Sequence, residues 1–322
     1  MTVTHTLVRE FEADLVVARV EKVAHDVVAV ALTRPDGEAL PDWTPGAHVD
    51  LVLDDGITRQ YSLCGRTSDT HSWRIAVLRS PDSRGGSEAV HHLTEGATVR
   101  VRGPRNHFPV VASPHYLFIA GGIGITPLVP MIDEAEAVGA DWQLFYGGRS
   151  RTSMAFADEL VARHGSRVHL IPEDEQGRLD LEGILRDPKP QTLVYACGPE
   201  PLLAAVEERC AAWPPGSLHL ERFSARPTSE GTDESTFEVV LQRSGKTLPV
   251  PPDKSVFEVV RAAGVSVLGS CLEGICGTCE TGVIDGEVEH RDSVLDDEER
   301  ESNEVMMICV SRCRSARLTL DL

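Results

Sequence analysis

The sequence is short of positive charge. Its 31 Lys and Arg residues stand against 50 Asp and Glu residues, so the formal net charge is −19 at pH 7. A strongly acidic surface repels nucleic acids and anionic membranes, which excludes both as expected partners but allows a basic protein partner. Long hydrophobic runs are missing as well. The uncharged stretch 116–132 contains three Gly and two Pro, which fits a buried strand, a turn and a helix start better than a membrane span.

Other absences narrow the class further. The first residues contain no long apolar segment of a secretory signal, so we expect a cytoplasmic protein, with the reduced thiols of that compartment. There is no nucleophile elbow, no acid–base pair of carboxylates and no histidine pair with the spacing of metal ligands on a helix. The length of 322 residues predicts two or three domains.

The pattern of apolar residues divides the chain into three parts. Residues 1–112 alternate apolar and polar positions in many short segments, with Asp55-Gly56 as a hairpin signal, which predicts an antiparallel β-barrel. Residues 113–226 alternate apolar strands with helices, which is typical of an α/β domain with a parallel sheet. Residues 227–232 resemble a linker, and residues 233–322 form a third, α+β domain with a helix over residues 255–263 before a cysteine-rich loop.

The expected elements are short and regularly spaced. In the first part the expected strands are residues 14–20, 25–32, 48–53, 57–63, 73–79 and 98–102. In the second part the expected strands are residues 117–120, 142–146, 168–172 and 192–196, and the expected helices are residues 126–138, 155–164 and 201–213. In the third part the expected strands are residues 236–243 and 246–250.

Four cysteines near the C-terminus have a distinctive spacing. Cys271, Cys276 and Cys279 follow the pattern C-x4-C-x2-C, and Cys309 follows later in the chain. This is the ligand pattern of plant-type [2Fe–2S] clusters, in which a tight loop provides three of the four thiolates. Gly274 and Gly277 allow the loop to bend toward the sulfurs and point N–H groups at them. The spacing therefore predicts a protein that transfers single electrons.

Other uses of these cysteines fit less well. A structural zinc site usually has two Cys pairs or Cys and His pairs, and only one C-x2-C is present here. Disulfides among three cysteines within nine residues would close strained loops. Cys313 competes with Cys309 for the fourth position, and spacing alone does not decide between them.

Two segments of the first part have the residues that a flavin needs. At the end of a predicted strand, Arg59 offers a cation, Tyr61 an aromatic wall and Ser62 a hydrogen-bonding group. The same residues are also compatible with a barrel strand that binds no ligand. Residues 83–93 form a glycine-rich turn that leads into a helix expected to be capped by Ser87. A helix start with free N–H groups beside Arg84 predicts a phosphate site.

Two loops of the second part predict a dinucleotide site. Residues 120–127, Ala-Gly-Gly-Ile-Gly-Ile-Thr-Pro, follow a strand and open a helix. Pro127 replaces the third glycine of the usual fingerprint, and it suits the first turn of a helix. The glycines still allow a pyrophosphate to approach the backbone. Residues 196–199 form a second strand-to-helix turn in the same domain. Either loop alone is also compatible with a tight turn that binds nothing.

Taken together and in order, these motifs resemble one family. The set comprises Arg59-Gln-Tyr-Ser, Gly85-Gly-Ser, residues 104–109, Gly121-Gly-Ile-Gly-Ile-Thr-Pro, Cys197-Gly-Pro and the C-terminal cysteines with His290-Arg-Asp. It is similar to the phthalate dioxygenase reductase and vanillate demethylase reductase family over nearly the whole chain. That resemblance implies a flavin barrel, a nicotinamide domain and a plant-type ferredoxin domain.

The resemblance also implies roles for individual residues. For FMN it implies Arg59, Gln60, Tyr61, Ser62, Arg79, Arg84, Gly85, Gly86 and Ser87. For NADH it implies Gly121, Gly122, Gly124, Thr126, Cys197 and Gly198. It places Phe223 over the flavin ring and selects Cys309 as the fourth cluster ligand. The resemblance implies that Ser62, Cys197 and Phe223 lie next to the reacting rings and are the catalytic residues.

The expected function follows from these cofactors. We expect a monomeric, NADH-dependent reductase that transfers a hydride to FMN, passes single electrons to the [2Fe–2S] cluster and delivers them to a terminal oxygenase. The expected partner is a Rieske-type aromatic oxygenase or demethylase. A cytochrome P450 is the alternative, because the partner is a separate chain that this sequence does not contain.

Overall fold

The computed structural model describes residues 11–53, 57–81, 85–225, 235–295 and 297–322. The chain divides into two compact units, Met1–Glu221 and Arg222–Leu322, and each is considered by itself. The predicted hairpin at Asp55-Gly56 and the predicted linker at residues 227–232 lie outside the described residues. In the described ranges no helix is long and apolar enough to cross a membrane.

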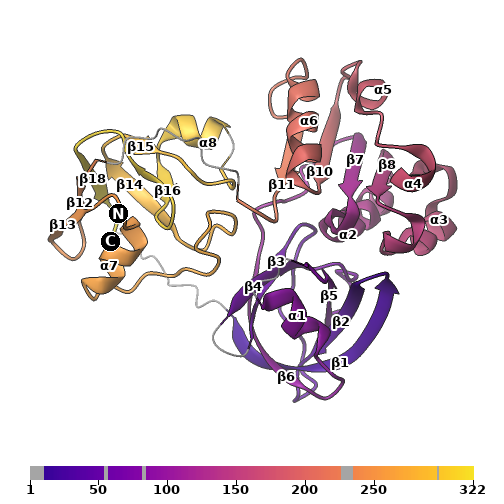
Figure 1. The fold of residues 1–322 in the computed structure, drawn as a ribbon, viewed down its shortest axis with the longest axis horizontal. Helices are drawn as coiled ribbons and strands as arrows, with labels where there is room; N and C mark the ends of the chain where they lie inside the picture. The colour runs from indigo at the N-terminus through magenta and orange to yellow at the C-terminus, as the bar shows by residue number, and fades with distance from the viewer. Residues whose placement is uncertain (1–10, 54–56, 82–84, 226–234, 296) are drawn as a thin grey trace. The chain divides into compact units, whose positions relative to one another are not determined.

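The first unit begins with a six-stranded antiparallel sheet in the order β4-β3-β6-β1-β2-β5. A bridge between Leu63 and Ile75 connects the two ends of the sheet, so the strands close into the predicted barrel (Figure 1). The elements are β1 (Glu12–Ala24), β2 (Val27–Thr33), β3 (His48–Val52), β4 (Thr58–Ser62), β5 (Ser72–Leu78), α1 (Gly86–His91) and β6 (Thr98–Arg105).

The barrel closes because alternate side chains of its strands point into one apolar core. Leu15, Val30, Val49 and Ile75 are all fully buried in this core. Val90 of the short helix α1 is fully buried in the same cluster, so α1 is attached to the barrel by its apolar side. This packing holds the helix start, with its glycines, beside the strands.

The second half of the first unit is a five-stranded parallel sheet in the order β11-β10-β7-β8-β9. Its strands are β7 (His115–Gly121), β8 (Asp141–Gly148), β9 (Val168–Pro172), β10 (Thr192–Cys197) and β11 (Leu218–Glu221). Its helices are η2 (Gly122–Gly124), α2 (Ile125–Ala137), η3 (Arg151–Ser153), α3 (Ala157–His164), η4 (Gly165–Arg167), α4 (Glu173–Gln176), α5 (Leu181–Leu185) and α6 (Glu200–Cys210).

Helices cover both faces of this sheet, as the sequence predicts. Phe118 and its neighbours on one face pack against α2 and α3, whereas Leu117 and Ile119 on the other face pack against α5 and α6. The first of these cores also includes Ala29 and Ala76 of the barrel, so the barrel and the parallel sheet share buried apolar surface within the unit. The strand order reverses between β7 and β10, which is where ligands bind in folds of this class.

The second unit is an α+β fold. Its main sheet has the order β13-β12-β18-β14-β16, in which β12 and β18 are parallel, and β15 pairs with β17 in a separate ladder. Its elements are β12 (Phe237–Leu241), β13 (Lys246–Val250), α7 (Val256–Ala262), β14 (Glu280–Asp285), β15 (Val288–Glu289), α8 (Asp297–Ser302), β16 (Val305–Met307), β17 (Arg312–Cys313) and β18 (Arg317–Leu320).

Local chemistry explains where the predicted helix of this unit begins. Ser255 and Glu258 form a reciprocal capping box, which satisfies two N–H groups at the start of α7. In contrast, the sequence did not predict β14 to β18 or α8. These elements are two to six residues long, too short to show a periodic apolar pattern, and β18 pairs with β12 from the opposite end of the domain.

Candidate functional site

The two glycine-containing loops predicted to bind NADH meet at the reversal of the strand order. A Cβ atom added to Gly124 would lie 2.2 Å from the carbonyl oxygen of Cys197. A Cβ atom on Gly198 would lie 3.0 Å from the Cα of Gly121. Only glycine allows the loops after β7 and β10 to approach this closely, and the approach leaves bare backbone at the mouth of the crevice.

The remaining predicted NADH residues line the same loop. Gly122 has φ 55°, a left-handed conformation that favours glycine. Thr126 is buried in the first turn of α2, where its hydroxyl donates to the carbonyl oxygen of Ile123 at 3.0 Å. Pro127 occupies the first turn of α2, as the sequence predicts. The glycines leave backbone groups of this loop without covering side chains, which suits a pyrophosphate.

Cys197 connects this crevice to the barrel through a carboxyl group. The Cys197 thiol is fully buried at the end of β10 and lies 4.0 Å from Oε2 of Glu221 at the end of β11. The hydroxyl of Ser62, at the end of barrel strand β4, donates to the same Oε2 at 3.4 Å. Two predicted catalytic residues, Ser62 and Cys197, thus contact one carboxyl group that joins the barrel to the parallel sheet.

Glu221 is a functional candidate that the sequence analysis missed. Burial raises the pKa of its carboxyl to about 8, although the hydrogen bond from Ser62 opposes that shift. Burial, followed by the charge of Glu221, also raises the pKa of the Cys197 thiol well above its ordinary value. A carboxyl group that retains its proton near neutral pH can donate as well as accept a hydrogen bond. The sequence analysis predicted no strand at residues 218–221, so the position of Glu221 at the carboxyl end of a parallel strand could not be recognised.

The predicted flavin strand and the glycine turn are neighbours in the structure. Arg59 lies on β4, and a Cβ atom added to Gly86 would lie 2.4 Å from Arg59 Cγ and 3.0 Å from its Nε. Gly85 has φ 88° and is packed against Ile57. The lack of side chains at both glycines leaves room for Arg59 beside the first N–H groups of α1. A cation beside free N–H groups fits a phosphate.

The other residues of β4 fit a ring-binding surface. Tyr61 is half-buried and packs against the barrel core, and burial raises the pKa of its hydroxyl to about 12. Gln60 is half-buried and paired with Asp50 across the sheet, whereas Ser62 is buried. Tyr61 therefore remains a neutral hydrogen-bonding group, and none of these residues introduces a negative charge that would repel a phosphate.

One expectation about the glycine turn is corrected. Ser87 is not the N-cap of α1: Gly85 is, without a side-chain cap, and Ser87 Oγ instead accepts a hydrogen bond from the backbone N–H of Ser80 at 3.1 Å. Gly85 adopts a left-handed conformation that favours glycine, and the helix starts directly after it. Arg79 forms an ion pair with Glu88 at 3.3 Å, which offsets part of its charge. Arg84 lies outside the described residues.

Phe223 belongs to the second compact unit, and 42% of its surface is exposed. An exposed aromatic ring is available to cover a planar ligand. The role of Phe223 over a flavin ring stays a prediction from the resemblance.

The four predicted cluster ligands gather in one place. The thiol of Cys271 interacts with the thiols of Cys276 and Cys309, and the thiol of Cys309 also interacts with that of Cys279. These contacts unite the tight loop with the segment after β16. Three of the four cysteines are buried, and Cys271 is partly exposed. Cys313 lies elsewhere, with its thiol 2.8 Å from the carbonyl oxygen of Ser315.

The backbone of the cysteine loop turns toward the sulfurs, as expected. The N–H of Glu273 lies 3.3 Å from Cys271 Sγ, and the N–H of Thr278 lies 3.4 Å from Cys276 Sγ. Gly274 and Gly277 both have φ 69°, which permits these bends. Four thiols, three of them within nine residues, with N–H groups pointing at the sulfurs, fit an iron–sulfur cluster well.

Family models match two parts of the chain. Residues 239–314 match the 2Fe-2S iron-sulfur cluster binding domain, and residues 118–208 match the oxidoreductase NAD-binding domain. The matched ranges contain the cysteine set and the two glycine loops described above. They confirm the predictions of an oxidoreductase with a nicotinamide domain and a ferredoxin domain.

Whole-chain relatives identify the family. The chain is 45% identical to the phenoxybenzoate dioxygenase subunit beta of Ectopseudomonas oleovorans, over 93% of this chain and 94% of that protein. It is 39% identical to the vanillate O-demethylase oxidoreductase of Pseudomonas sp. (strain HR199 / DSM 7063), over 96% of this chain and 99% of that protein. The chain therefore belongs to the family of oxygenase reductases that includes phthalate dioxygenase reductase and vanillate O-demethylase oxidoreductase.

Solved structures agree with this membership. Phthalate dioxygenase reductase, described as modular for electron transfer from pyridine nucleotides to [2Fe-2S], is 37% identical with a TM-score of 0.71, covering 97% of this chain and 98% of that one. An intact type IV self-sufficient cytochrome P450 monooxygenase is 46% identical with a TM-score of 0.92. The similarity covers 97% of this chain and 41% of that one, so this chain spans about two fifths of that protein's length.

Proposed function

We propose that this chain is the NADH-dependent reductase component of an oxygenase system, with FMN on the barrel, NADH in the crevice of the parallel sheet and a [2Fe–2S] cluster in the C-terminal unit. The observation that carries the proposal is the contact of Ser62 and Cys197 with the single carboxyl of Glu221. It brings the end of the flavin strand to the mouth of the nicotinamide crevice. Hydride transfer needs this proximity of two ring sites.

When bound, the three cofactors supply hydride transfer and single-electron transfer, and the protein supplies binding and orientation. Arg59 and the N–H groups after Gly85 would hold the FMN phosphate. Bare backbone at Gly121 and Gly124 would hold the pyrophosphate of NADH, with Cys197 and Gly198 beside the nicotinamide. With FMN bound, the Ser62 hydroxyl would donate to the flavin ring edge and accept a hydrogen bond from the protonated Glu221 carboxyl, which holds Ser62 and Cys197 near each other.

The proposed electron acceptor is a terminal Rieske-type aromatic oxygenase or demethylase. This proposal is supported by the relatives, which are named for phenoxybenzoate, phthalate and vanillate systems. The net charge of −19 favours a partner with a basic docking surface, so the transfer rate should fall as ionic strength rises. We further propose a cytoplasmic monomer with domain boundaries at residues 1–112, 113–226 and 233–322.

A cytochrome P450 is a second candidate for the acceptor. The similarity that favours it is the TM-score of 0.92 to a self-sufficient P450 monooxygenase, which exceeds the 0.71 of phthalate dioxygenase reductase. The names of several full-length relatives favour the Rieske-type partner. The two candidates share every residue assignment within this chain, because they differ only in the acceptor.

An anaerobic experiment tests the proposal. NADH added in excess, so that it supplies the three electrons that FMN and the cluster accept together, should bleach the flavin absorbance of the complete protein and produce the electron paramagnetic resonance signal of a reduced [2Fe–2S] cluster. A flavin that is reduced while the cluster stays oxidised would contradict the electron path. Turnover is then compared with the oxygenase component of phthalate dioxygenase and with the haem domain of the P450, each at matched concentration. Faster NADH-dependent turnover with the haem domain would favour the second candidate.

A further inference from the structure

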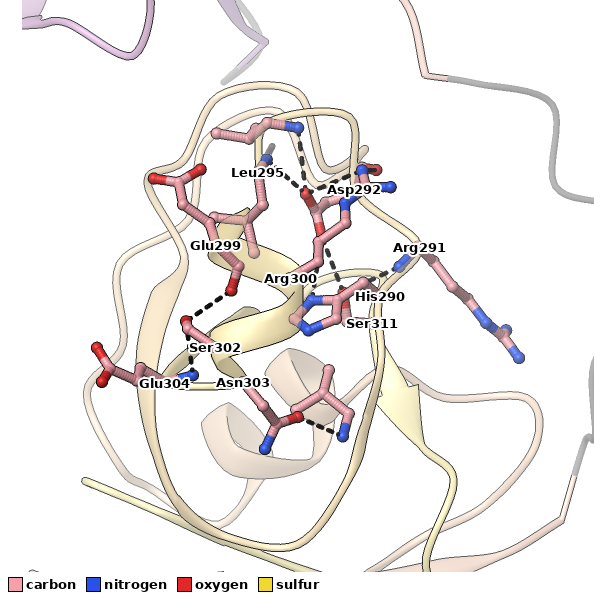
Figure 2. A network of polar contacts seen from close by, with 12 residues as sticks. His290, Arg291, Asp292, Leu295, Glu299, Arg300, Ser302, Asn303, Glu304 and Ser311 are labelled. Carbon is pink, nitrogen blue, oxygen red and sulfur yellow. Dashed lines mark hydrogen bonds and ion pairs between the residues drawn. The ribbon is translucent and has the colours of Figure 1, made fainter. Parts of the chain in front are cut away.

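Asp292 is a buried carboxylate in the second unit with an unusual number of partners. Its side chain has no exposed surface. Oδ2 accepts hydrogen bonds from the backbone N–H groups of Val294 at 3.1 Å and Leu295 at 2.9 Å. The hydroxyl of Ser311 donates to Oδ1 at 3.4 Å. Figure 2 shows Asp292 with Leu295, Ser311 and two basic side chains around it.

The two basic side chains are His290 and Arg300. His290 Nδ1 lies 3.7 Å from Oδ1, and only 8% of the His290 side chain is exposed. Arg300 Nη2 lies 3.8 Å from Oδ2 and donates to the backbone carbonyl of Asp292 at 2.7 Å (Figure 2). Burial by itself would raise the pKa of Asp292, but His290, the two N–H groups and Arg300 hold that pKa below its ordinary value. The carboxylate is thus charged in the folded protein.

The segment that carries Asp292 lies against both parts of the cysteine site. The N–H of Ser293 donates to the carbonyl oxygen of Gly274 in the cysteine loop at 2.8 Å. A Cβ atom on Gly274 would lie 3.1 Å from the Cα of Asp292 and 2.5 Å from Val310 Cγ2. Ser311, which donates to Asp292, follows Cys309 by two positions. Asp292 therefore connects the loop of three cysteines to the segment of the fourth.

We propose that Asp292 is a positioning residue for the [2Fe–2S] site and that its buried negative charge lowers the reduction potential of the cluster. The inference rests on the proposed function, because it concerns the cluster of that function. Reduction adds an electron to the site, and an adjacent negative charge in a medium of low dielectric constant opposes that addition. The guanidinium group of Arg300 partly offsets the charge of the carboxylate.

The test uses the complete protein loaded with its cofactors and measures the midpoint potential of the cluster by redox titration. Asp292→Asn retains the shape and the acceptor oxygen but removes the charge. We expect its potential to rise by an amount that shifts the one-electron equilibrium at least tenfold, about 59 mV. Glu304→Gln is the matched control, since Glu304 is an exposed carboxylate in the same unit, and its potential should stay unchanged.

A second variant covers the case in which Asp292→Asn loses its cluster. Arg300→Gln leaves the carboxylate in place and removes the opposing positive charge, so the potential should fall. The inference is wrong if the midpoint potential of the cluster in Arg300→Gln equals that of the parent protein and the same holds for any Asp292→Asn protein that retains its cluster. A parent protein that shows no [2Fe–2S] signal after reduction by NADH would instead refute the proposed function, so the two failures are distinguishable.

Discussion

Ser62 and Glu221 are 159 positions apart in the sequence, yet the Ser62 hydroxyl donates a hydrogen bond to the Glu221 carboxyl at 3.4 Å. One residue ends a strand of the barrel, and the other ends the edge strand of the parallel sheet. The pair therefore fixes the relation between the flavin strand and the nicotinamide crevice. Its carboxyl should also give the stability of the protein a characteristic pH dependence.

Glu221→Gln should remove that dependence. Burial raises the pKa of Glu221 in the folded state to about 8, against an ordinary value of 4.5. Above about pH 4.5 the unfolded chain loses a proton that the folded chain keeps. The free energy of unfolding should therefore fall by up to about 1.4 kcal/mol per pH unit until about pH 8. Denaturant titrations over this range should show a smaller slope for Glu221→Gln than for the parent.

The control for this experiment is Glu134→Gln, because Glu134 is exposed on α2. Its pH dependence should match that of the parent protein. Equal slopes in the parent and in Glu221→Gln would show that Glu221 does not retain its proton.

Arg59→Met should weaken flavin binding. Arg59 lies against Gly86 at the start of α1, and a charge-assisted hydrogen bond to a phosphate is worth about 1.5–3 kcal/mol. We expect the dissociation constant of FMN to rise at least about tenfold, measured by flavin fluorescence. Arg66→Met, at an exposed position of the same barrel, should bind normally. Flavin released by acid from the parent should be FMN, and recovery of FAD would contradict the assignment.

Asp158→Asn should reduce the preference for NADH. The parent should use NADH at least about tenfold better than NADPH. Arg151 forms an ion pair with Asp158 and is thereby kept from binding a 2′-phosphate. Exposed pairs contribute about 0.2–1 kcal/mol, so the ratio of kcat/KM values should fall by at most about fivefold. Asp133→Asn breaks the similar ion pair with Arg163 and should leave the ratio unchanged. If Asp158→Asn and Asp133→Asn have the same ratio of kcat/KM for NADH to kcat/KM for NADPH, this role of Asp158 is refuted.

Cys309→Ser should lose the cluster absorbance while FMN stays bound, whereas Cys313→Ser should keep a normal spectrum. The thiol of Cys309 interacts with those of Cys271 and Cys279, but the thiol of Cys313 lies against Ser315. Visible circular dichroism and iron analysis of both variants provide the measurement. Loss of iron from Cys313→Ser alone would reverse the assignment of the fourth ligand.

Sequence reasoning was most successful where the cause of a structure is local. The helix predicted over residues 255–263 begins in the structure with the N-cap Ser255, whose capping box with Glu258 depends on hydrogen bonds that span only three residues. Local reasoning failed at Ser87, where the left-handed backbone of Gly85 moved the helix start upstream. The assignments of individual cofactor residues and the domain boundaries stay predictions, for which the experiments above are designed.

The sequence by itself determined the cofactor classes and the order of the domains. The cysteine spacing indicates an iron–sulfur cluster, and the glycine loops indicate that a phosphate group can approach the backbone. Both patterns lie within short segments of the chain. Only the tertiary structure decided which distant groups meet. Glu221 contacts Ser62 and Cys197 because two sheets share a core, and Asp292 joins the cysteine loop to Ser311 because a buried carboxylate must find partners wherever the fold provides them.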